Sequence, residues 1–266
     1  MKGGTALFLA QMARRHGGVI RLGAQSTAIE HELNATGQSV APQSLVNLLG
    51  EMVAEGEAIR IVAGVYALPD AHGRYNSTAI GPRLAVGPAY ASMWPVASMA
   101  NLSTNVPRLV SVVSTQDGHQ VRERILPVPA LDVVFYFHTL SPARFFGFTE
   151  HPLGDGLTAP VASTEKALVD MLWFGDAPDA PPASEQMAMW EASASSSSVN
   201  PKLLLRYVIR MDSPSLTRRA GYLMERFGIK GFESLLEHRG TSKRVIPLFA
   251  GDPGVTSAPA NRWGVR

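Results

Sequence analysis

The chain has 266 residues, 45% of them hydrophobic, a formal net charge of +2 and no cysteine. This length and composition allow one large domain or two ordinary ones with a buried core. The lack of cysteine excludes disulfides, thiolate metal ligands and cysteine nucleophiles. The apolar run from Ala6 to Ala10 is too short for a signal-peptide core, and no segment is long enough to cross a membrane, so we expect a cytoplasmic protein.

The first predicted element is a helix from Thr5 to His16, which ends at two glycines. Arg14 and Arg15 close this helix with positive charge, which suits the negative end of a helix dipole as well as a DNA phosphate, and both interpretations stay open. A short strand follows over residues 18–22. A second helix is expected from about Ser26 to Asn34, with a turn over residues 34–38. The inner side of the first helix is expected to hold Leu9, Met12 and Ala13.

The segment from Ser39 to Leu68 has the clearest pattern in the chain. Its first half places apolar residues at the spacing of one helix face, while short polar side chains occupy the opposite face. Its second half carries β-branched and aromatic residues on both sides of Ala63 and Gly64, which predicts a two-stranded hairpin. The apolar face consists of Leu45, Leu48, Leu49, Met52 and Val53, and the polar face consists of Gln43, Ser44, Asn47 and Glu51.

This order of elements, in which two short helices precede a third helix and a hairpin, is typical of a winged helix-turn-helix. The last helix of such a module enters the DNA major groove. Short polar side chains suit this role because Asn and Gln can form two hydrogen bonds with an adenine edge. Arg60 of the hairpin is placed to contact a phosphate. The alternative is an ordinary helix and hairpin packed inside a larger domain.

The distribution of charge along the chain weakens the DNA-binding interpretation. Residues 1–67 contain five basic and five acidic side chains, residues 68–199 contain seven and twelve, and residues 200–266 contain twelve and five. The basic surplus is therefore at the C-terminal end and not in the predicted winged helix-turn-helix. This counts against DNA binding there, because basic side chains that neutralise phosphate supply most nonspecific DNA affinity. Helix N-termini, backbone amides or the C-terminal segment would have to supply further phosphate contacts.

The middle of the chain predicts a linker and then a sheet. Residues 69–82 are polar and rich in glycine and proline, as expected of a linker. Residues 88–102 predict a helix with a kink at Pro95. Three segments rich in β-branched and aromatic residues are predicted strands of one sheet: 108–114, 121–126 and 132–138.

Three further helices are predicted in the C-terminal half, separated by loops at 176–183 and 194–198. The first begins at Ser163, which caps it, and contains an i,i+4 pair of Lys166 and Asp170. The others span 202–211 and 214–228. Their basic side chains form either a solvated face or a second contact surface for DNA or protein: Lys202, Arg206, Arg210, Arg218 and Arg219.

Motifs of catalysis are almost absent. Ser163 to Lys166 matches the S-x-x-K of serine β-lactamases, but the S-D-N and K-T-G triplets of that class are missing, so a capped structural helix is the better interpretation. The histidines show no metal-ligand spacing, and His138 is expected to be packed or at the surface rather than a base. Nucleotide-binding glycine motifs and G-x-S-x-G are missing too. We therefore expect no catalytic residue, metal or cofactor, and no enzyme activity.

Three blocks of the sequence resemble the AbiEi-type antitoxins of type IV toxin-antitoxin (abortive infection) systems. They are G-V-Y-A-L-P at the end of the hairpin, P-A-Y-A-S-M-W-P-V-A-S-M-A-N-L-S-T-N-V-P from Pro88, and V-A-S-T-E-K-A-L-V-D-M-L-W from Val161. The last block is the most specific, and the resemblance spans roughly Val19 to Gly228. It places Gln43, Ser44 and Asn47 in the recognition helix, and Arg60 and Gly64 in the wing.

The resemblance implies a bacterial or archaeal repressor that binds inverted repeats in the operator of its own operon, self-associates on that double-stranded DNA and counteracts a nucleotidyltransferase-like toxin. Two features depart from the family: the N-terminal segment lacks net positive charge, and Ser193 to Ser198 form a serine-rich insert. The rival interpretation is a protein-interaction module whose winged domain holds a partner protein without physiological DNA binding.

The predicted fold is mixed α/β (α+β), with an N-terminal winged helix-turn-helix and a C-terminal mixed sheet-and-helix domain. The winged domain is expected over residues 1–68 and the antitoxin-type α/β domain over 83–250. Residues 251–266, rich in glycine, proline and alanine, are expected to form an extended or mobile tail.

Overall fold

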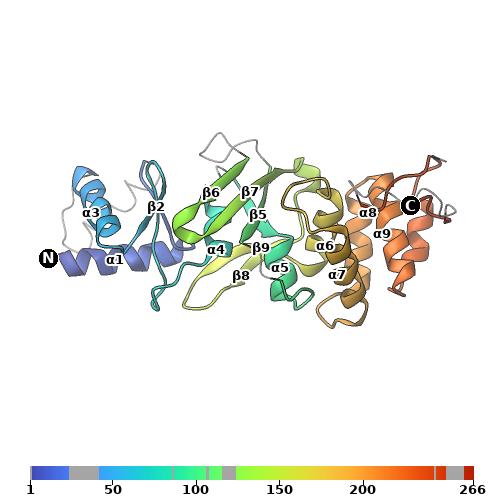
Figure 1. Cartoon of the computed structure of the whole chain (residues 1–266), viewed down its shortest axis with the longest axis horizontal. Coiled ribbons are helices and arrows are strands. Elements are labelled where there is room, and N and C mark those ends of the chain that lie inside the picture. The colour runs from blue at the N-terminus through green and yellow to red at the C-terminus, as the bar shows by residue number, and fades with distance from the viewer. Residues whose placement is uncertain are drawn as a thin grey trace.

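The computed structural model describes residues 2–23, 42–85, 87–105, 108–115, 124–242, 244–249 and 261–266, with backbone alone for 2–7, 42 and 43. The predicted helix near residues 26–34, the turn after it and residues 121–123 lie outside the described residues. The molecule is elongated, with a small N-terminal lobe (residues 2–68) at one end, a central sheet, and helices at the other end (Figure 1). The predicted mixed α/β fold is confirmed.

The N-terminal lobe holds two described helices and a small antiparallel sheet. Helix α1 (Lys2–Arg15) leads into β1 (Val19–Arg21), and α3 (Pro42–Ala54) leads into the hairpin of β2 (Ile59–Val62) and β3 (Val65–Ala67). The strand order is β1-β3-β2. Both helices bury their apolar faces against this sheet, as predicted, because leucines and methionines recur there at helical spacing. The shared core contains Leu9, Met12, Ile20, Leu45, Leu49, Met52, Tyr66 and Leu68.

A six-stranded mixed sheet forms the centre of the molecule, in the order β6-β7-β5-β4-β9-β8. The strands predicted at 108–114 and 132–138 are confirmed at 109–114 and 133–139, and both belong to this sheet. The strand predicted at 121–126 overlaps the observed strand 125–128 only in its last two residues. The pairs β5·β7 and β4·β9 are parallel, and the other neighbours are antiparallel. The strands are β4 (Ala89–Ser92), β5 (Leu109–Ser114), β6 (Ile125–Val128), β7 (Val133–Thr139), β8 (Phe148–Pro152) and β9 (Thr158–Ala162).

The segment predicted as a linker contains a helix, α4 (Ser77–Leu84). The side chain of Asn76 caps it by accepting a hydrogen bond from the Ala79 backbone N–H at 3.1 Å. Helix α4 lies directly on the sheet, where a Cβ at Gly81 would come within 2.9 Å of Val112. Gly81 and Pro82 therefore allow close packing here instead of marking a loop. Ile80 and Leu84 join Val19, Val65 and Ala67 in one apolar cluster, which connects the two sheets.

The helix predicted over residues 88–102 is wrong in its first half. Residues 89–92 form the central strand β4, which is buried on both faces, and only Trp94–Met99 forms a helix, α5. Pro95 lies in the first turn of α5, where a proline needs no backbone N–H partner, so it starts the helix rather than kinking it. A strand buried on both faces has no polar alternation, which explains why its pattern suggested a helix.

Four helices cover the far end of the sheet: α6 (Thr164–Trp173), α7 (Ala183–Ser195), α8 (Pro201–Arg210) and α9 (Pro214–Arg226). The predicted Ser163 cap is confirmed, since its Oγ accepts the Lys166 backbone N–H at 3.2 Å. No helix in the described ranges has the length and apolar character needed to cross a membrane.

The predicted tail is wrong for its last six residues. Trp263 is 1% exposed and packs on Gly221 of α9, where an added Cβ would lie 2.3 Å from the indole. Val265 forms a bridge with Ile246. Residues 251–260, where glycine, proline and alanine are concentrated, lie outside the described part of the chain.

Candidate nucleic-acid interface

The exposed side of α3 is the candidate DNA-contacting surface. Pro42 is the first residue of the helix, a position that tolerates a missing N–H. Because Leu45 and Leu49 are fully buried, Ser44 and Asn47 are turned outward, and both are exposed. The structure leaves the side chain of Gln43 undescribed. Neither Ser44 nor Asn47 is covered by the C-terminal half of the molecule, so the predicted orientation of these two residues is confirmed.

The β2–β3 hairpin adds one basic residue to this end of the molecule. Arg60 of β2 is exposed and makes no ion pair or side-chain hydrogen bond with the described residues. Gly64 has a φ of +75° in the turn, a conformation that favours glycine. Helix α3 and β2 lie at the same end of the molecule (Figure 1). Asn47 and Arg60 therefore belong to one end of the structure, as a recognition helix and wing require.

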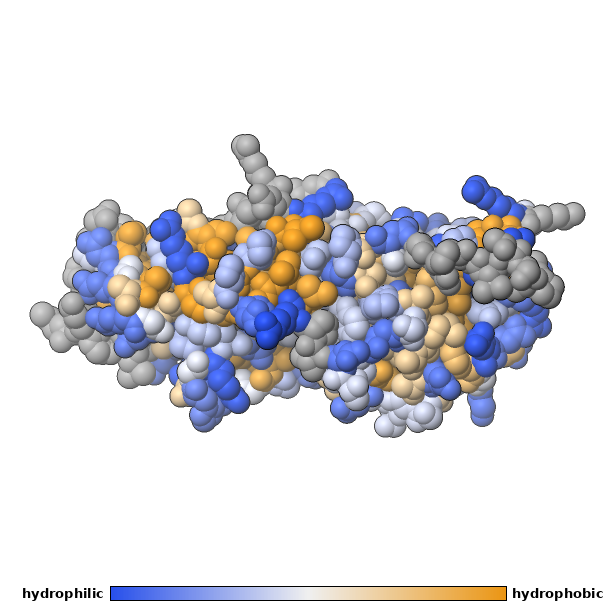
Figure 2. Space-filling view, in the orientation of Figure 1, coloured by the Kyte–Doolittle hydropathy of each residue, from blue (hydrophilic) through white to orange (hydrophobic). Residues whose placement is uncertain are grey.

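The surface of α3 is polar rather than basic. The helix contains no lysine or arginine, and Glu51 and Glu55 are exposed at its C-terminal end. Val46 is 38% exposed beside Asn47. Figure 2 shows hydrophilic and apolar side chains mixed over this lobe. Base-edge contacts by hydrogen bonds and by an apolar side chain on a thymine methyl fit this surface better than strong phosphate binding does.

Arg14 and Arg15 lie at the end of α1, close to helix α4. An added Cβ at Gly17, two residues later, would lie 2.9 Å from the carbonyl oxygen of Ala79 in α4. Arg14 is half-buried, and its Nε has no hydrogen-bond partner among the described residues, while Arg15 is exposed. The structure therefore places this pair beside the joint between the lobes, and α3 lies nearer the opposite end of α1 (Figure 1).

The predicted second basic surface is present only in part. Lys202, Arg206 and Arg210 of α8 are exposed, and Arg210 also lies 4.1 Å from the centre of the Phe146 ring. Arg219 is half-buried and donates to the Pro247 carbonyl oxygen at 3.0 Å. The prediction that Arg218 belongs to this surface is wrong. It is 5% exposed, because its guanidinium donates to the backbone carbonyls of Trp263, Arg244 and Gly264.

The S-x-x-K residues do not form a serine–lysine pair. The Lys166 ammonium is fully buried and is bound by the carboxylate of Asp170, one turn further along α6, as the i,i+4 spacing predicts. Ser92 and Tyr90 donate to the other oxygen of that carboxylate at 2.8 and 3.1 Å. Burial, and then the Asp170 charge, raise the pKa of Tyr90 well above its usual value. Lys166 is therefore occupied as a structural cation.

A second buried cluster brings together a serine, a histidine and an aspartate that the sequence had not connected. Ser111 donates to Oδ2 of Asp179 at 2.5 Å, and Nε2 of His138 lies 2.9 Å from the same oxygen. A serine nucleophile needs the histidine as its hydrogen-bond partner, whereas here both residues contact the aspartate. His138 also packs on Phe174, with ring centres 4.4 Å apart. The described residues contain no group of three potential metal ligands.

Comparisons with known proteins give a likeness of fold. No family model and no curated protein sequence matches the chain. Among solved structures, the crystal structure of the RV2827C protein from Mycobacterium tuberculosis superposes with a TM-score of 0.55 at 12% sequence identity. The match covers 98% of this chain and 90% of that one, so the likeness includes both lobes.

Proposed function

We propose that this protein is a DNA-binding transcriptional repressor of its own operon and the antitoxin of a type IV toxin-antitoxin pair. One observation carries the DNA-binding part: Ser44 and Asn47 are exposed on α3, while Leu45, Leu49 and Met52 on its opposite face are buried. A helix held in this way can enter the major groove without rearrangement of its lobe. Repression would follow from occupancy of the operator.

The antitoxin part rests on the resemblance to AbiEi-type proteins, above all on the V-A-S-T-E-K-A-L-V-D-M-L-W block. In the structure this block forms the end of β9 and the buried helix α6. Its residues therefore support the fold of the C-terminal half. A toxin or a second copy of the chain would instead contact the exposed stripe of Lys202, Arg206 and Arg210 on α8. A nucleotidyltransferase-like gene beside this one would support the pairing, and co-expression should relieve the toxicity of its product.

A mobility shift with the DNA upstream of the gene tests repression. At moderate salt and with excess unrelated competitor, the protein should retard this DNA and leave a scrambled duplex of the same composition unbound. Specific binding usually exceeds nonspecific binding by a factor of about 10³ or more. Equal retardation of the two duplexes would contradict the proposal.

The second candidate is a protein-interaction module. Val46 is exposed in the middle of the outward face of α3, and this helix contains no lysine or arginine. An exposed apolar residue with polar neighbours is also what a small protein interface presents. If the upstream DNA is not bound and Val46→Asp abolishes capture of the neighbouring gene product, this second function is the correct one.

A further inference from the structure

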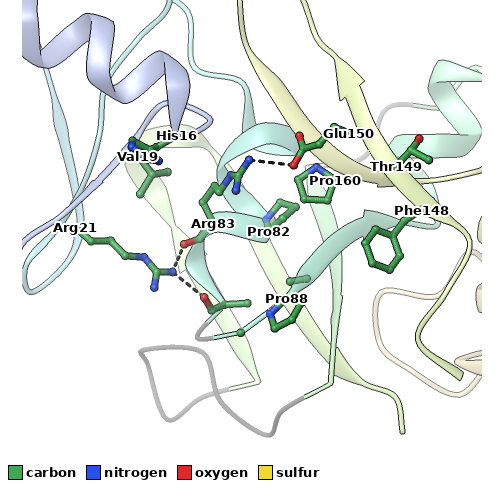
Figure 3. A pocket seen from close by; sticks show the side chains of 13 residues that line it. His16, Val19, Arg21, Pro82, Arg83, Pro88, Phe148, Thr149, Glu150 and Pro160 are labelled. Atoms are coloured by element: carbon green, nitrogen blue, oxygen red, sulfur yellow. Dashed lines mark hydrogen bonds and ion pairs between the residues drawn. The ribbon is translucent and has the colours of Figure 1, made fainter. Parts of the chain in front are cut away.

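A cavity of about 390 Å³ lies where the N-terminal lobe meets the central sheet. Its walls come from three parts of the chain: the end of α1 with β1, residues 82–85 and 87–89, and the paired strands β8 and β9 (Figure 3). Cavities of this size with apolar walls and a few polar groups are the usual form of small-molecule sites.

The polar groups of the cavity are mostly basic. His16, Arg21 and Arg83 line it together with one carboxylate, that of Glu150. Arg21 donates to the backbone carbonyls of Arg83 and Ala85, the latter at 2.9 Å, and so ties β1 to the C-terminal end of α4 (Figure 3). Burial, and then the nearby charge of Arg83, lower the pKa of Arg21. An anion would reduce this concentration of positive charge.

Arg83 has hydrogen-bonding capacity that the described residues do not use. One terminal nitrogen lies 3.4 Å from the half-exposed carboxylate of Glu150, a weak contact. Its Nε is buried and has no hydrogen-bond partner among the described residues. The Arg83 side chain lines the cavity and is 32% exposed, so its guanidinium can also donate to a bound phosphate or carboxylate.

The apolar wall is built of groups that move little. Phe148 stacks on Tyr90 with ring centres 4.7 Å apart. Three prolines, whose rings restrict the backbone, line the cavity together with Phe148. The cavity is therefore formed before any ligand arrives. Its apolar lining includes Val19, Pro82, Pro88, Phe148 and Pro160.

We propose that this cavity binds a small organic anion. Its phosphate or carboxylate group is held by Arg83 and His16, and its apolar part packs against Phe148 and the prolines. Because the walls belong to both lobes, the bound ligand contacts the N-terminal lobe and the central sheet at once. Ligand binding therefore changes how firmly the N-terminal lobe is held against the central sheet, and this changes the affinity for DNA. This last step rests on the proposed function, whereas ligand binding does not.

Titration calorimetry on the full chain tests ligand binding, with phenyl phosphate and benzoate as probes and phenol as the uncharged control. We expect the anions to bind and phenol to bind at least about tenfold more weakly, since a charge-assisted hydrogen bond contributes that much. Arg83→Gln should weaken anion binding by a similar factor. Glu150→Gln should strengthen it, because a repulsive carboxylate that competes for Arg83 is removed.

Arg108→Gln is the matched control, because it removes an exposed arginine of an ion pair outside the cavity and should leave binding unchanged. Equal binding of phenol and phenyl phosphate, or an unaltered affinity in both Arg83→Gln and Glu150→Gln, would overturn the proposal. So would a loss of duplex DNA binding in Arg83→Gln without any binding of phenyl phosphate, because the cavity would then hold a DNA phosphate. Operator affinity with and without phenyl phosphate is measured separately, so a failure of DNA binding leaves the calorimetric result valid.

Discussion

Helices α3 and α6 both carry polar side chains among leucines, yet these side chains face opposite environments. On α3, Ser44 and Asn47 are exposed, because the sheet and α1 cover only one side of the helix. On α6, Lys166 and Asp170 are fully buried beneath the neighbouring strands and helices. Polar residues with helical spacing therefore face solvent in one lobe and stabilise the interior in the other. Substitutions on α6 should therefore lower the free energy of unfolding. Substitutions on α3 should weaken DNA binding and leave the free energy of unfolding nearly unchanged.

The largest expected effect is a loss of stability in Asp170→Ala. This substitution leaves the Lys166 ammonium buried without its counter-charge, and breaking such a pair costs about 3–5 kcal/mol of the free energy of unfolding. Urea denaturation of the purified variant measures the change. Arg108→Ala, which breaks an exposed ion pair with Asp132, is the control and should cost less than about 1 kcal/mol. An unfolding midpoint equal to that of the wild type in Asp170→Ala would show that α6 does not depend on this pair.

Asn47→Ala should show the opposite behaviour. We expect operator binding to weaken by about 1–3 kcal/mol, the range for a two-bond contact with a base edge. The free energy of unfolding should change by less than about 0.5 kcal/mol, because the side chain is at the surface. Fluorescence anisotropy with labelled operator gives the first quantity and urea denaturation the second. If affinity stays constant, or if affinity and stability fall together, α3 does not act as a recognition helix.

Arg60→Ala separates phosphate contacts from base contacts within the N-terminal lobe. Loss of one phosphate contact should weaken binding to all duplexes alike and reduce the slope of log affinity against log salt by about 1. Anisotropy at several salt concentrations, on operator and scrambled DNA, measures both. Arg206→Ala on α8 is the matched substitution at the other end of the molecule. An unchanged salt slope in Arg60→Ala together with a reduced slope in Arg206→Ala would assign the phosphate contacts to the C-terminal half.

The smallest effect is expected for Ser44→Ala. A single neutral hydroxyl contact contributes about 0.5–1.5 kcal/mol to binding, so the loss of operator affinity should be below that of Asn47→Ala. The same anisotropy assay detects it. A larger loss in Ser44→Ala than in Asn47→Ala would mean that the helix enters the groove in a different orientation.

Sequence patterns predict the helices α1 and α3 of the N-terminal lobe well, because each has one buried face and one exposed face. The spacing of Leu45, Leu49 and Met52 is enough to orient α3. The same reasoning fails for β4 and α4, which are buried on almost all sides. A strand such as Ala89–Ser92 then lacks polar alternation, and residues such as Gly81 and Pro82 resemble a loop. Strands β8 and β9 and helix α7 were not predicted at all.

Contacts between distant parts of the chain account for the remaining differences. Arg218 has the spacing of an exposed basic residue, and the return of residues 244 and 263–264 to α9 buries it. The i,i+4 pair of Lys166 and Asp170 was predicted, but its burial depends on strand β4, which supplies Tyr90 and Ser92. The cavity at the joint of the two lobes is likewise lined by three separate segments, and no local motif indicates it.

The most direct measurement of the central claim uses the absence of cysteine from the chain. A single cysteine placed at Ser44 can be coupled to an iron–EDTA group, which cleaves DNA close to its point of attachment. We predict cleavage of the operator at a few positions within each half-site when the group is on α3, and none when it is attached through Lys202→Cys on α8. Equal cleavage from both positions, or no cleavage from position 44 while the operator is bound, would contradict the account.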